Sequence, residues 1–189
     1  MPNFIHEQFL EDVSLCDRII EAHKNTDLKW QGKVNIGVDT VSTPGVDTSI
    51  KDSIDSKLDG DLLQEYSVHL RNVANNYIKL FPSCNMHASW GIVQDVNVQH
   101  YAPQGGFKVW HTERSNMHYP ASSRHLVFMT YLNDVTDQGG TEFAEYKLTV
   151  SAEKGKTVIW PCDWTHTHRG VVSPTQEKFI VTGWFNYIS

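Results

Sequence analysis

Long apolar runs, paired cysteines and a basic leader are all missing from this 189-residue chain. No stretch approaches the roughly 18 apolar residues of a membrane-spanning helix, so we expect no membrane partner. The start of the chain, MPNFIHEQFLEDVS, has neither the basic end nor the apolar core of a secretory signal. Only three cysteines occur, Cys16, Cys84 and Cys162, without a CxxC motif, which predicts reduced thiols instead of a disulfide framework. Together these absences predict a soluble cytoplasmic protein.

An excess of basic charge is also missing, because 16 Lys and Arg residues face 22 Asp and Glu residues and leave a formal charge of −6. A protein that binds nucleic acid regardless of its sequence needs a broad basic surface. We therefore expect no nucleic-acid partner. What the chain does have is 40% hydrophobic residues, enough for one domain with a sizeable core.

Two segments in the first part of the chain carry the apolar spacing of amphipathic helices. The first covers residues 14–23, where Ser14 and Asp17 have the spacing of a capping box. The second is clearer: apolar residues recur every three or four positions over residues 62–77, and Pro82 ends the pattern. We expect this second helix to back a sheet.

Beyond Pro82 the sequence changes to short β-prone runs separated by clusters of Gly, Pro, Asn and Asp. This spacing is typical of a sandwich or a jelly roll. We therefore predict a mainly β fold with N-terminal helices. No linker, repeat or low-complexity segment divides the chain, so we predict a single domain over residues 1–189, with a helical part at about 1–82 and a jelly-roll core at about 83–189.

His111 and Glu113 are separated by one residue in the run FKVWHTE. If this run is extended, side chains two positions apart leave the same face of the strand, so the imidazole and the carboxylate share one space. A third ligand is available far downstream, at His166 or His168, and strand parity does not choose between two residues that share a face. Two histidines and one carboxylate with the remaining positions open form the facial triad of non-haem Fe(II) oxygenases.

The last β-prone run begins at Lys178, which parity places on one face with Ile180, Thr182 and Trp184. A lysine at the end of an otherwise buried face needs an anionic partner, because an unpaired buried ammonium is costly. An anionic cosubstrate would meet this need.

One order of motifs runs through roughly residues 95–187. It consists of Tyr101, then His111-x-Glu113, Gly139-Gly140-Thr141-x-Phe143, His168, Lys178 and finally Gly183-Trp184-Phe185. This order resembles the Fe(II)- and 2-oxoglutarate-dependent dioxygenases and, within them, the prolyl 4-hydroxylase-like branch. Its specific part is the spacing, because Tyr101 lies ten residues before His111 and Lys178 lies ten residues after His168.

The resemblance implies a double-stranded β-helix, a jelly roll with iron at one open end. It implies that Tyr101 helps to hold 2-oxoglutarate and that Lys178 binds its far carboxylate. The interval to this lysine selects His168 over His166 as the distal ligand. Weaker transfers give Tyr131 and Trp184 as further residues around the cosubstrate. The implied cofactors are Fe(II), 2-oxoglutarate and O2, with ascorbate as a further candidate.

The activity implied by the resemblance is hydroxylation of a C–H bond with release of succinate and CO2. The leading substrate is a peptidyl proline or another protein or peptide side chain, and a small molecule stays open. One departure is the HxE motif of His111 and Glu113, because the family usually has HxD. The longer side chain presents the same carboxylate, so we expect iron binding to survive while the substrate of the family transfers less directly.

Two other interpretations remain. The first is a non-catalytic, cupin-like jelly-roll module that binds a metal or a ligand, although structural zinc usually has four protein ligands and only three candidates are aligned here. The second is a cupin-type dioxygenase without a cosubstrate, against which Lys178 argues. Arg124 and Arg169 are left open between contact with a ligand and a surface salt bridge.

Overall fold

The computed structural model describes residues 2–36 and 43–188. Its helices are α1 (Ser14–Asn25) and α2 (Gly60–Leu80), with short 3-10 turns at η1 (Pro82–Asn85), η2 (Ala121–Ser123) and η3 (Trp164–His166). Its strands are β1 (His6–Phe9), β2 (Lys29–Gln31), β3 (Val34–Ile36), β4 (Thr43–Gly45), β5 (Lys51–Asp52), β6 (Ile54–Lys57), β7 (Trp90–Gly91), β8 (Asn97–Tyr101), β9 (Gly106–Phe107), β10 (Arg124–Tyr131), β11 (Thr141–Phe143), β12 (Leu148–Val150), β13 (Lys156–Pro161), β14 (His168–Gly170) and β15 (Lys178–Tyr187).

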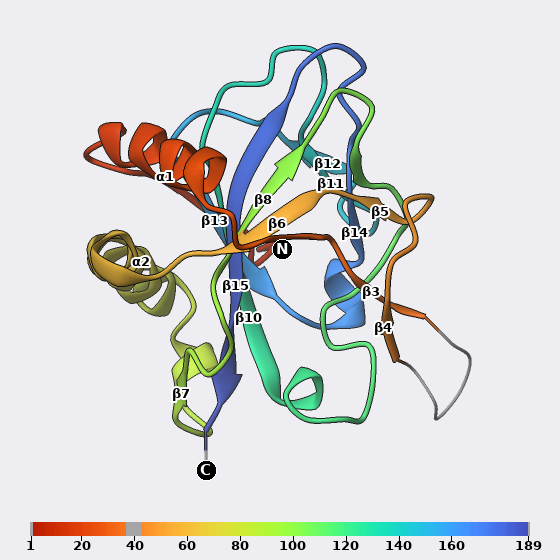
Figure 1. The fold of residues 1–189 in the computed structure, drawn as a ribbon. Helices are drawn as coiled ribbons and strands as arrows, with labels where there is room; N and C mark the ends of the chain where they lie inside the picture. The colour runs from red at the N-terminus through yellow and green to blue at the C-terminus, as the bar shows by residue number, and fades with distance from the viewer. Residues whose placement is uncertain (1, 37–42, 189) are drawn as a thin grey trace.

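Two antiparallel sheets form the body of the described structure. The main sheet has the order β1-β13-β10-β15-β8-β6-β2, with β7 also paired to β15, and the minor sheet has the order β12-β11-β14. Figure 1 shows the two helices on one side of the main sheet and the minor sheet on the other side. The predicted fold class, a mainly β jelly roll with N-terminal helices, is confirmed.

The central strand β15 separates two environments by the alternation of its side chains. Phe179, Val181 and Phe185 belong to the core under the helices. The residues between them line a cavity on the opposite face; they are Lys178, Ile180, Thr182 and Trp184. The division predicted from parity is therefore confirmed, and it places a lysine inside the protein.

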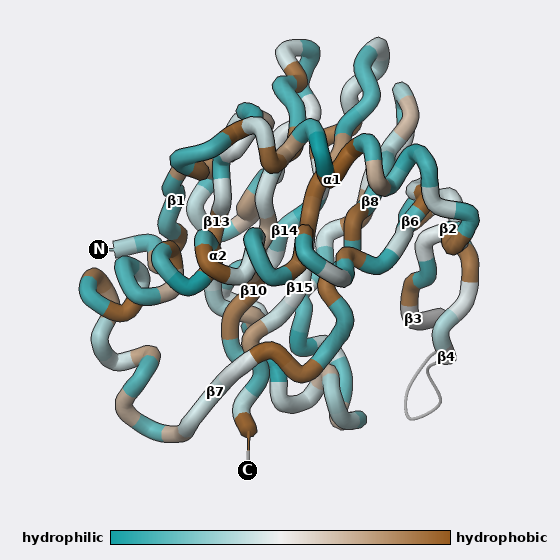
Figure 2. The backbone as a smooth tube through the Cα atoms, turned by 60° about the vertical axis from the view of Figure 1, so that its left-hand side comes forward, coloured by the Kyte–Doolittle hydropathy of each residue, from teal (hydrophilic) through white to brown (hydrophobic). Residues whose placement is uncertain are grey.

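The apolar stripe of α2 packs on the main sheet, as its spacing predicts. Tyr66, Leu70, Val73 and Tyr77 are all buried in the same core as Phe179 of β15. Figure 2 views this arrangement from the helical side. The helix thus fixes one face of β15 and leaves the other face to the cavity.

The start of α1 differs from the expected capping box. The residue before the helix is Val13, and no side chain caps it. Instead, the Asp12 carboxylate accepts a hydrogen bond from the Ser14 backbone N–H at 2.9 Å. An acidic residue just before the helix thus accepts a hydrogen bond from one of the free N–H groups at the helix start.

The helical part expected at about residues 1–82 also supplies strands to the main sheet. β1 pairs with β13, while β6 pairs with β8 and carries β2 at the sheet edge. Each of these strands has only three or four residues, too few to show a clear alternation in the sequence. Within the described residues no helix has the length and apolar content to cross a membrane.

Gly183 offers a test of the packing across β15. A Cβ atom there would lie 2.4 Å from Cζ of Phe128, a buried ring of β10. We expect Gly183→Ala to lower the free energy of unfolding by about 1–3 kcal/mol, because the core is overpacked. Urea denaturation followed by tryptophan fluorescence measures this change.

The matched control is Gly91→Ala in β7, where a Cβ atom would meet only Cδ1 of Ile188 at 3.9 Å. It should change the free energy of unfolding much less than Gly183→Ala. Equal effects of the two substitutions would contradict the packing argument.

Candidate active site

A cavity of about 530 Å³ lies between the main sheet and the minor sheet. Residues of β8, β10 and β15 form one wall, while β14 and the segment 107–115 form the other. All seven residues singled out in the sequence line it; they are Tyr101, His111, Glu113, Tyr131, His168, Lys178 and Trp184. The structure therefore brings the predicted site residues into one cavity.

His111 and His168 are held side by side by an isolated antiparallel bridge. The N–H of each residue donates to the carbonyl of the other at 3.0 Å. The expected continuous strand over residues 107–113 is not present, because β9 ends at Phe107 and the chain becomes extended again only at this bridge. The bridge still orients His111 and Glu113 into one space.

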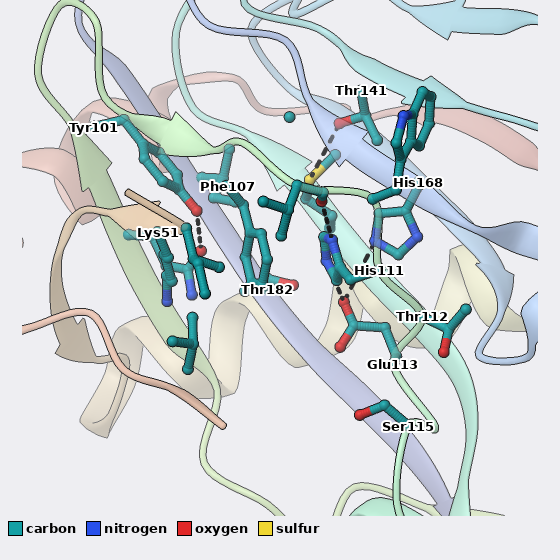
Figure 3. Close-up of a pocket in the computed structure, with 18 of the residues that line it drawn as sticks. Lys51, Tyr101, Phe107, His111, Thr112, Glu113, Ser115, Thr141, His168 and Thr182 are labelled. Carbon is teal, nitrogen blue, oxygen red and sulfur yellow. Dashed lines mark hydrogen bonds and ion pairs between the residues drawn. The ribbon is translucent and has the colours of Figure 1, made fainter. Parts of the chain in front are cut away.

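Nε2 of His111, Nε2 of His168 and Oε1 of Glu113 converge. The carboxylate oxygen lies 3.6 Å from the first nitrogen and 3.4 Å from the second, and the group of ligand atoms fits within 4.8 Å. Figure 3 shows the three side chains at one end of the cavity. The spacing suits three ligands of one metal ion.

The outer nitrogens of the two imidazoles fix their tautomers. Nδ1 of His111 lies 3.0 Å from the carbonyl of Val109, and Nδ1 of His168 lies 2.8 Å from the carbonyl of His166. A carbonyl only accepts hydrogen bonds, so each Nδ1 carries a proton, and the neutral form of each ring presents a lone pair at Nε2. This is how metal-binding histidines are usually oriented.

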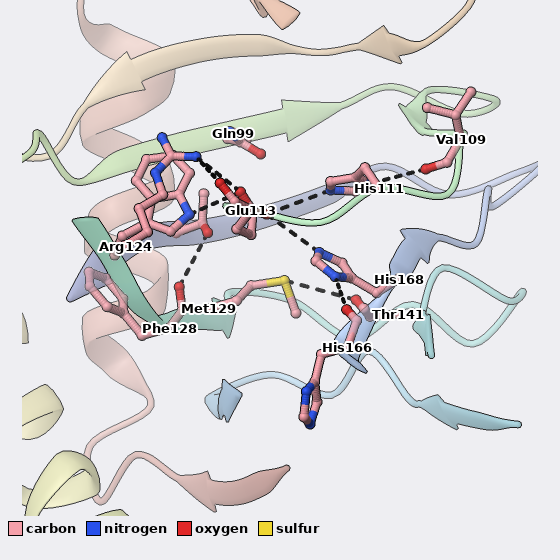
Figure 4. Close-up of polar contacts among 12 residues, drawn as sticks. Gln99, Val109, His111, Glu113, Arg124, Phe128, Met129, Thr141, His166 and His168 are labelled. Carbon is pink, nitrogen blue, oxygen red and sulfur yellow. Dashed lines mark hydrogen bonds and ion pairs between the residues drawn. The ribbon is translucent and has the colours of Figure 1, made fainter. Parts of the chain in front are cut away.

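Glu113 is held from behind by two donors. Its Oε2 accepts hydrogen bonds from Nε1 of Trp184 at 3.0 Å and from Nη1 of Arg124 at 3.4 Å. The Arg124 guanidinium also lies 3.5 Å over the Trp184 ring. These contacts leave Oε1 directed toward the histidines (Figure 4).

The charge states at this cluster follow from burial and neighbours. Burial acts to raise the pKa of Glu113, but interactions with His111 and His168 outweigh it and hold the pKa well below its usual value. Burial lowers the pKa of the His168 imidazole. The carboxylate is thus anionic, and burial favours the neutral form of the His168 imidazole.

The chemistry of this donor set fits a divalent metal. When Nε2 of each ring carries no proton, two nitrogen lone pairs and one carboxylate oxygen face one another, an arrangement that a bound cation stabilises. Two nitrogens and one oxygen suit Fe(II) with open positions. Structural zinc would usually have a fourth protein ligand, which this group does not supply.

Lys178 lies in the same cavity without an acidic partner among the described residues. Its Nζ donates to the carbonyl of Gly139 at 2.8 Å and lies 5.2 Å from the centre of the Tyr101 ring. Burial lowers the pKa of this lysine to about 8. A buried ammonium that has only a carbonyl as a partner favours the binding of an anion.

Two further buried donors in the cavity wall lack acceptors in the protein. They are Nε1 of Trp160 and Nε of Arg124. The Trp160 ring also packs edge-on against His168, with the ring centres 5.0 Å apart. Unpaired buried donors of this kind are rare and costly in folded proteins.

The two tyrosines of the predicted site have their hydroxyl groups bonded inside the protein. The Tyr101 hydroxyl donates to Oε1 of Gln99 at 2.7 Å, and the Tyr131 hydroxyl lies 2.7 Å from Oγ1 of Thr141. Both rings are buried in the cavity wall.

His166 lies outside the cluster. Its Nε2 lies 2.8 Å from the carbonyl of Asn3, and its ring points away from the other two histidines (Figure 4). Its backbone carbonyl, however, orients His168. His166 thus contacts the cluster through its main-chain carbonyl and not through its ring.

Sequence reasoning left the position of Arg124 open and did not single out Gln99. Gln99 lies two residues before Tyr101 in β8, so parity puts both side chains on the same face. Its place in the cavity wall could therefore have been predicted from the sequence. Arg124 is different, because the register of β10 shifts between Arg124 and Leu126. This irregularity brings Arg124 to the cavity face that Met129 and Tyr131 share.

Comparisons with known proteins agree with this geometry. Residues 96–186 match the profile of the family described as the 2OG-Fe(II) oxygenase superfamily. No curated protein matches the chain. The chain does match solved structures.

A viral collagen prolyl hydroxylase from Paramecium Bursaria Chlorella virus-1, in its 2OG complex, has a TM-score of 0.71 at 16% identity, over 98% of this chain and 97% of that one. A prolyl-4-hydroxylase from Pseudomonas putida has a TM-score of 0.67 at 15% identity, over 96% and 92%. A Trichoplax adhaerens prolyl hydroxylase, in complex with a hypoxia inducible factor oxygen degradation domain peptide fragment, has a TM-score of 0.71 at 15% identity, over 98% and 84%.

Residues 96–186 therefore match the 2OG-Fe(II) oxygenase superfamily, the family that the order of motifs resembles. The fold around them is the jelly roll of the prolyl hydroxylases. The family supports a dioxygenase and implies Fe(II) and 2-oxoglutarate as its cofactors.

The two histidines of the THTH run can be separated by metal binding. We expect His168→Ala to lose stoichiometric Fe(II) binding in anaerobic equilibrium dialysis, because one of three converging ligand atoms is removed. His166→Ala should keep it, since the carbonyl that orients His168 remains. Loss of iron from His166→Ala with retention by His168→Ala would show that the ligand assignment is reversed.

Proposed function

We propose that the protein is an Fe(II)- and 2-oxoglutarate-dependent dioxygenase that hydroxylates a C–H bond. His111, Glu113 and His168 would hold the iron, and Lys178 would bind the far carboxylate of 2-oxoglutarate. The observation that carries this proposal is the placement of a three-acceptor cluster and an unpaired buried lysine in one cavity. A metal module without a cosubstrate would have no use for this lysine.

The cavity would hold 2-oxoglutarate between the cluster and Lys178. Phe107 and Thr182 lie between the Tyr101 side and the His–Glu–His end in Figure 3. Tyr101, Tyr131 and Trp184 contribute to the walls. When bound, iron with 2-oxoglutarate and O2 supplies the oxidation that releases succinate and CO2 and hydroxylates a C–H bond, and ascorbate is a candidate for keeping the metal reduced.

The protein's own contribution is to orient and to exclude water. Carbonyl groups hold the two imidazoles, and Trp184 and Arg124 hold the Glu113 carboxylate. Behind the cluster, buried apolar side chains such as Phe143 and Ile180 form a second core. A dry, fixed wall of this kind is what a reactive cofactor requires from the protein.

A peptide or protein side chain is the leading substrate class, with peptidyl proline first. The solved relatives are prolyl hydroxylases, and one of them holds a peptide fragment. Near the metal cluster, the cavity includes the Trp110 ring, which is 43% exposed and has the Arg169 guanidinium 4.5 Å from its centre. An exposed aromatic plane beside the cluster suits a small apolar ring or side chain.

Succinate release tests the proposed activity. The protein, loaded anaerobically with Fe(II), should release succinate from 2-oxoglutarate when O2 and a pool of proline-containing peptides are added. The double variant His111→Ala/Glu113→Ala, which lacks two of the three ligands, should not. Release at an equal rate by wild type and double variant, or none from wild type with any peptide or small-molecule pool, would overturn the proposal.

Lys178 gives this function a pH dependence with a defined sign. Below its pKa of about 8 the ammonium is present and the affinity for 2-oxoglutarate should be constant. Above that pH the affinity should fall by up to about tenfold per pH unit, because the free lysine must first take up a proton. Calorimetric titration of the zinc-loaded protein with 2-oxoglutarate between pH 7 and 9 measures this.

The matched variants are Lys178→Arg and Lys178→Met. The arginine variant should show a flat affinity over the same range, because a guanidinium stays charged. The methionine variant should bind about tenfold more weakly or worse at pH 7, since one partner of a desolvated charge pair is lost. A wild-type profile as flat as that of Lys178→Arg would place the carboxylate elsewhere.

A further inference from the structure

A buried polar network lies in the cavity wall on the side of Tyr101. It runs from Lys51 in β5 through Asp55 in β6 and Gln99 in β8 to the Tyr101 hydroxyl, and all four side chains are buried. Figure 3 shows Lys51 and Tyr101 together, on the side of the cavity away from the metal-ligand cluster.

The network starts from a buried carboxylate. Asp55 accepts from Nζ of Lys51 at 2.7 Å and from Oγ of Ser53 at 2.7 Å. These contacts are tightly enclosed, because a Cβ atom at Gly32 would lie 2.2 Å from Oγ of Ser53 and 2.9 Å from Cε of Lys51. The position of the carboxylate is therefore well determined.

The Asp55 carboxylate fixes which way the Gln99 amide points. A carboxylate cannot donate, so the NH2 end of the amide faces Asp55, at 3.5 Å, and Oε1 faces the other way. That oxygen accepts the proton of the Tyr101 hydroxyl at 2.7 Å. Reversing the amide would set its oxygen against the carboxylate and its NH2 group against Tyr101.

A tyrosine hydroxyl has one proton to donate, and here it donates that proton in its hydrogen bond to Oε1 of Gln99. Burial raises the pKa of Tyr101 well above its usual value, with the Asp55 and Glu113 charges adding to this effect, so the hydroxyl keeps its proton. Toward the cavity it therefore offers lone pairs and no donor. A carboxylate placed there would meet an oxygen that cannot donate to it.

We propose that Gln99 is a positioning residue of the cosubstrate pocket, because it accepts the Tyr101 hydrogen bond and leaves the 2-oxoglutarate carboxylate to Lys178 alone. This inference rests on the proposed function. Tyr101 then contributes its ring, which lies beside the Lys178 ammonium, and not a donated hydrogen bond. The affinity for 2-oxoglutarate is therefore lower than it would be if the Tyr101 hydroxyl were free to donate a hydrogen bond to the ligand.

A double-mutant cycle on 2-oxoglutarate binding tests the proposal. Wild type, Tyr101→Phe, Gln99→Met and the double variant are loaded with zinc, which does not support turnover, and titrated calorimetrically. Tyr101→Phe should bind within about twofold of wild type. Gln99→Met should bind about tenfold more tightly, because the freed hydroxyl gains a charge-assisted hydrogen bond. The double variant should return to the wild-type affinity.

Two results would overturn the proposal. The first is a tenfold or larger loss of affinity in Tyr101→Phe alone, which would show that the hydroxyl donates to 2-oxoglutarate in spite of Gln99. The second is an unchanged affinity in folded Gln99→Met. Tyr101→Phe removes one oxygen atom only, so its result decides even if Gln99→Met does not fold.

A second cycle separates this inference from the proposed function. The unfolding equilibrium of the metal-free variants should show a Gln99–Tyr101 coupling of about fivefold, as expected for a buried neutral hydrogen bond. Coupling of this size with no binding of 2-oxoglutarate to wild type would remove the proposed function, and the ligand role of Gln99 with it, while leaving the hydrogen bond. Additive effects would remove the hydrogen bond itself.

Discussion

The site depends on the backbone bridge between His111 and His168. This pair of reciprocal hydrogen bonds joins the segment after β9 to the first residue of β14. It sets the two imidazoles 4.3 Å apart between ring centres and brings Glu113, two residues beyond, against both. The minor sheet continues the bridge, because Phe143 of β11 pairs with His168. A change in this register would separate the three acceptors that define the cluster.

Much of this arrangement follows from periodicity and spacing. Alternation along β15 predicted that Lys178 and Trp184 share one face, and the interval taken from the resembling family favoured His168 over His166, which the structure turns away. Other features lie beyond such patterns. The short strands β1, β2 and β6 show little alternation, and the register shift in β10 reverses the side on which Arg124 emerges. Neither effect has a sequence signal of its own.

Both oxygens of the Glu113 carboxylate, which stands in place of the usual aspartate, have fixed partners. The Glu113 carboxylate meets the two imidazoles with Oε1, and Trp184 and Arg124 bind Oε2 from the opposite side. The carboxylate therefore bridges two sets of fixed groups, the imidazoles at Oε1 and the Trp184 and Arg124 donors at Oε2. The cost of burying this anion is offset by the guanidinium and by the metal that the cluster fits.

The central claim is that the cluster binds one metal ion through Oε1 of Glu113 while Oε2 stays with Trp184. Anaerobic crystals grown with Fe(II), with anomalous diffraction recorded at the iron edge, test it most directly. The account predicts a single peak within bonding distance of Nε2 of His111, Nε2 of His168 and Oε1 of Glu113, with the Trp184 hydrogen bond intact. A peak elsewhere, or a carboxylate that binds iron with both oxygens and has left Trp184, would contradict it.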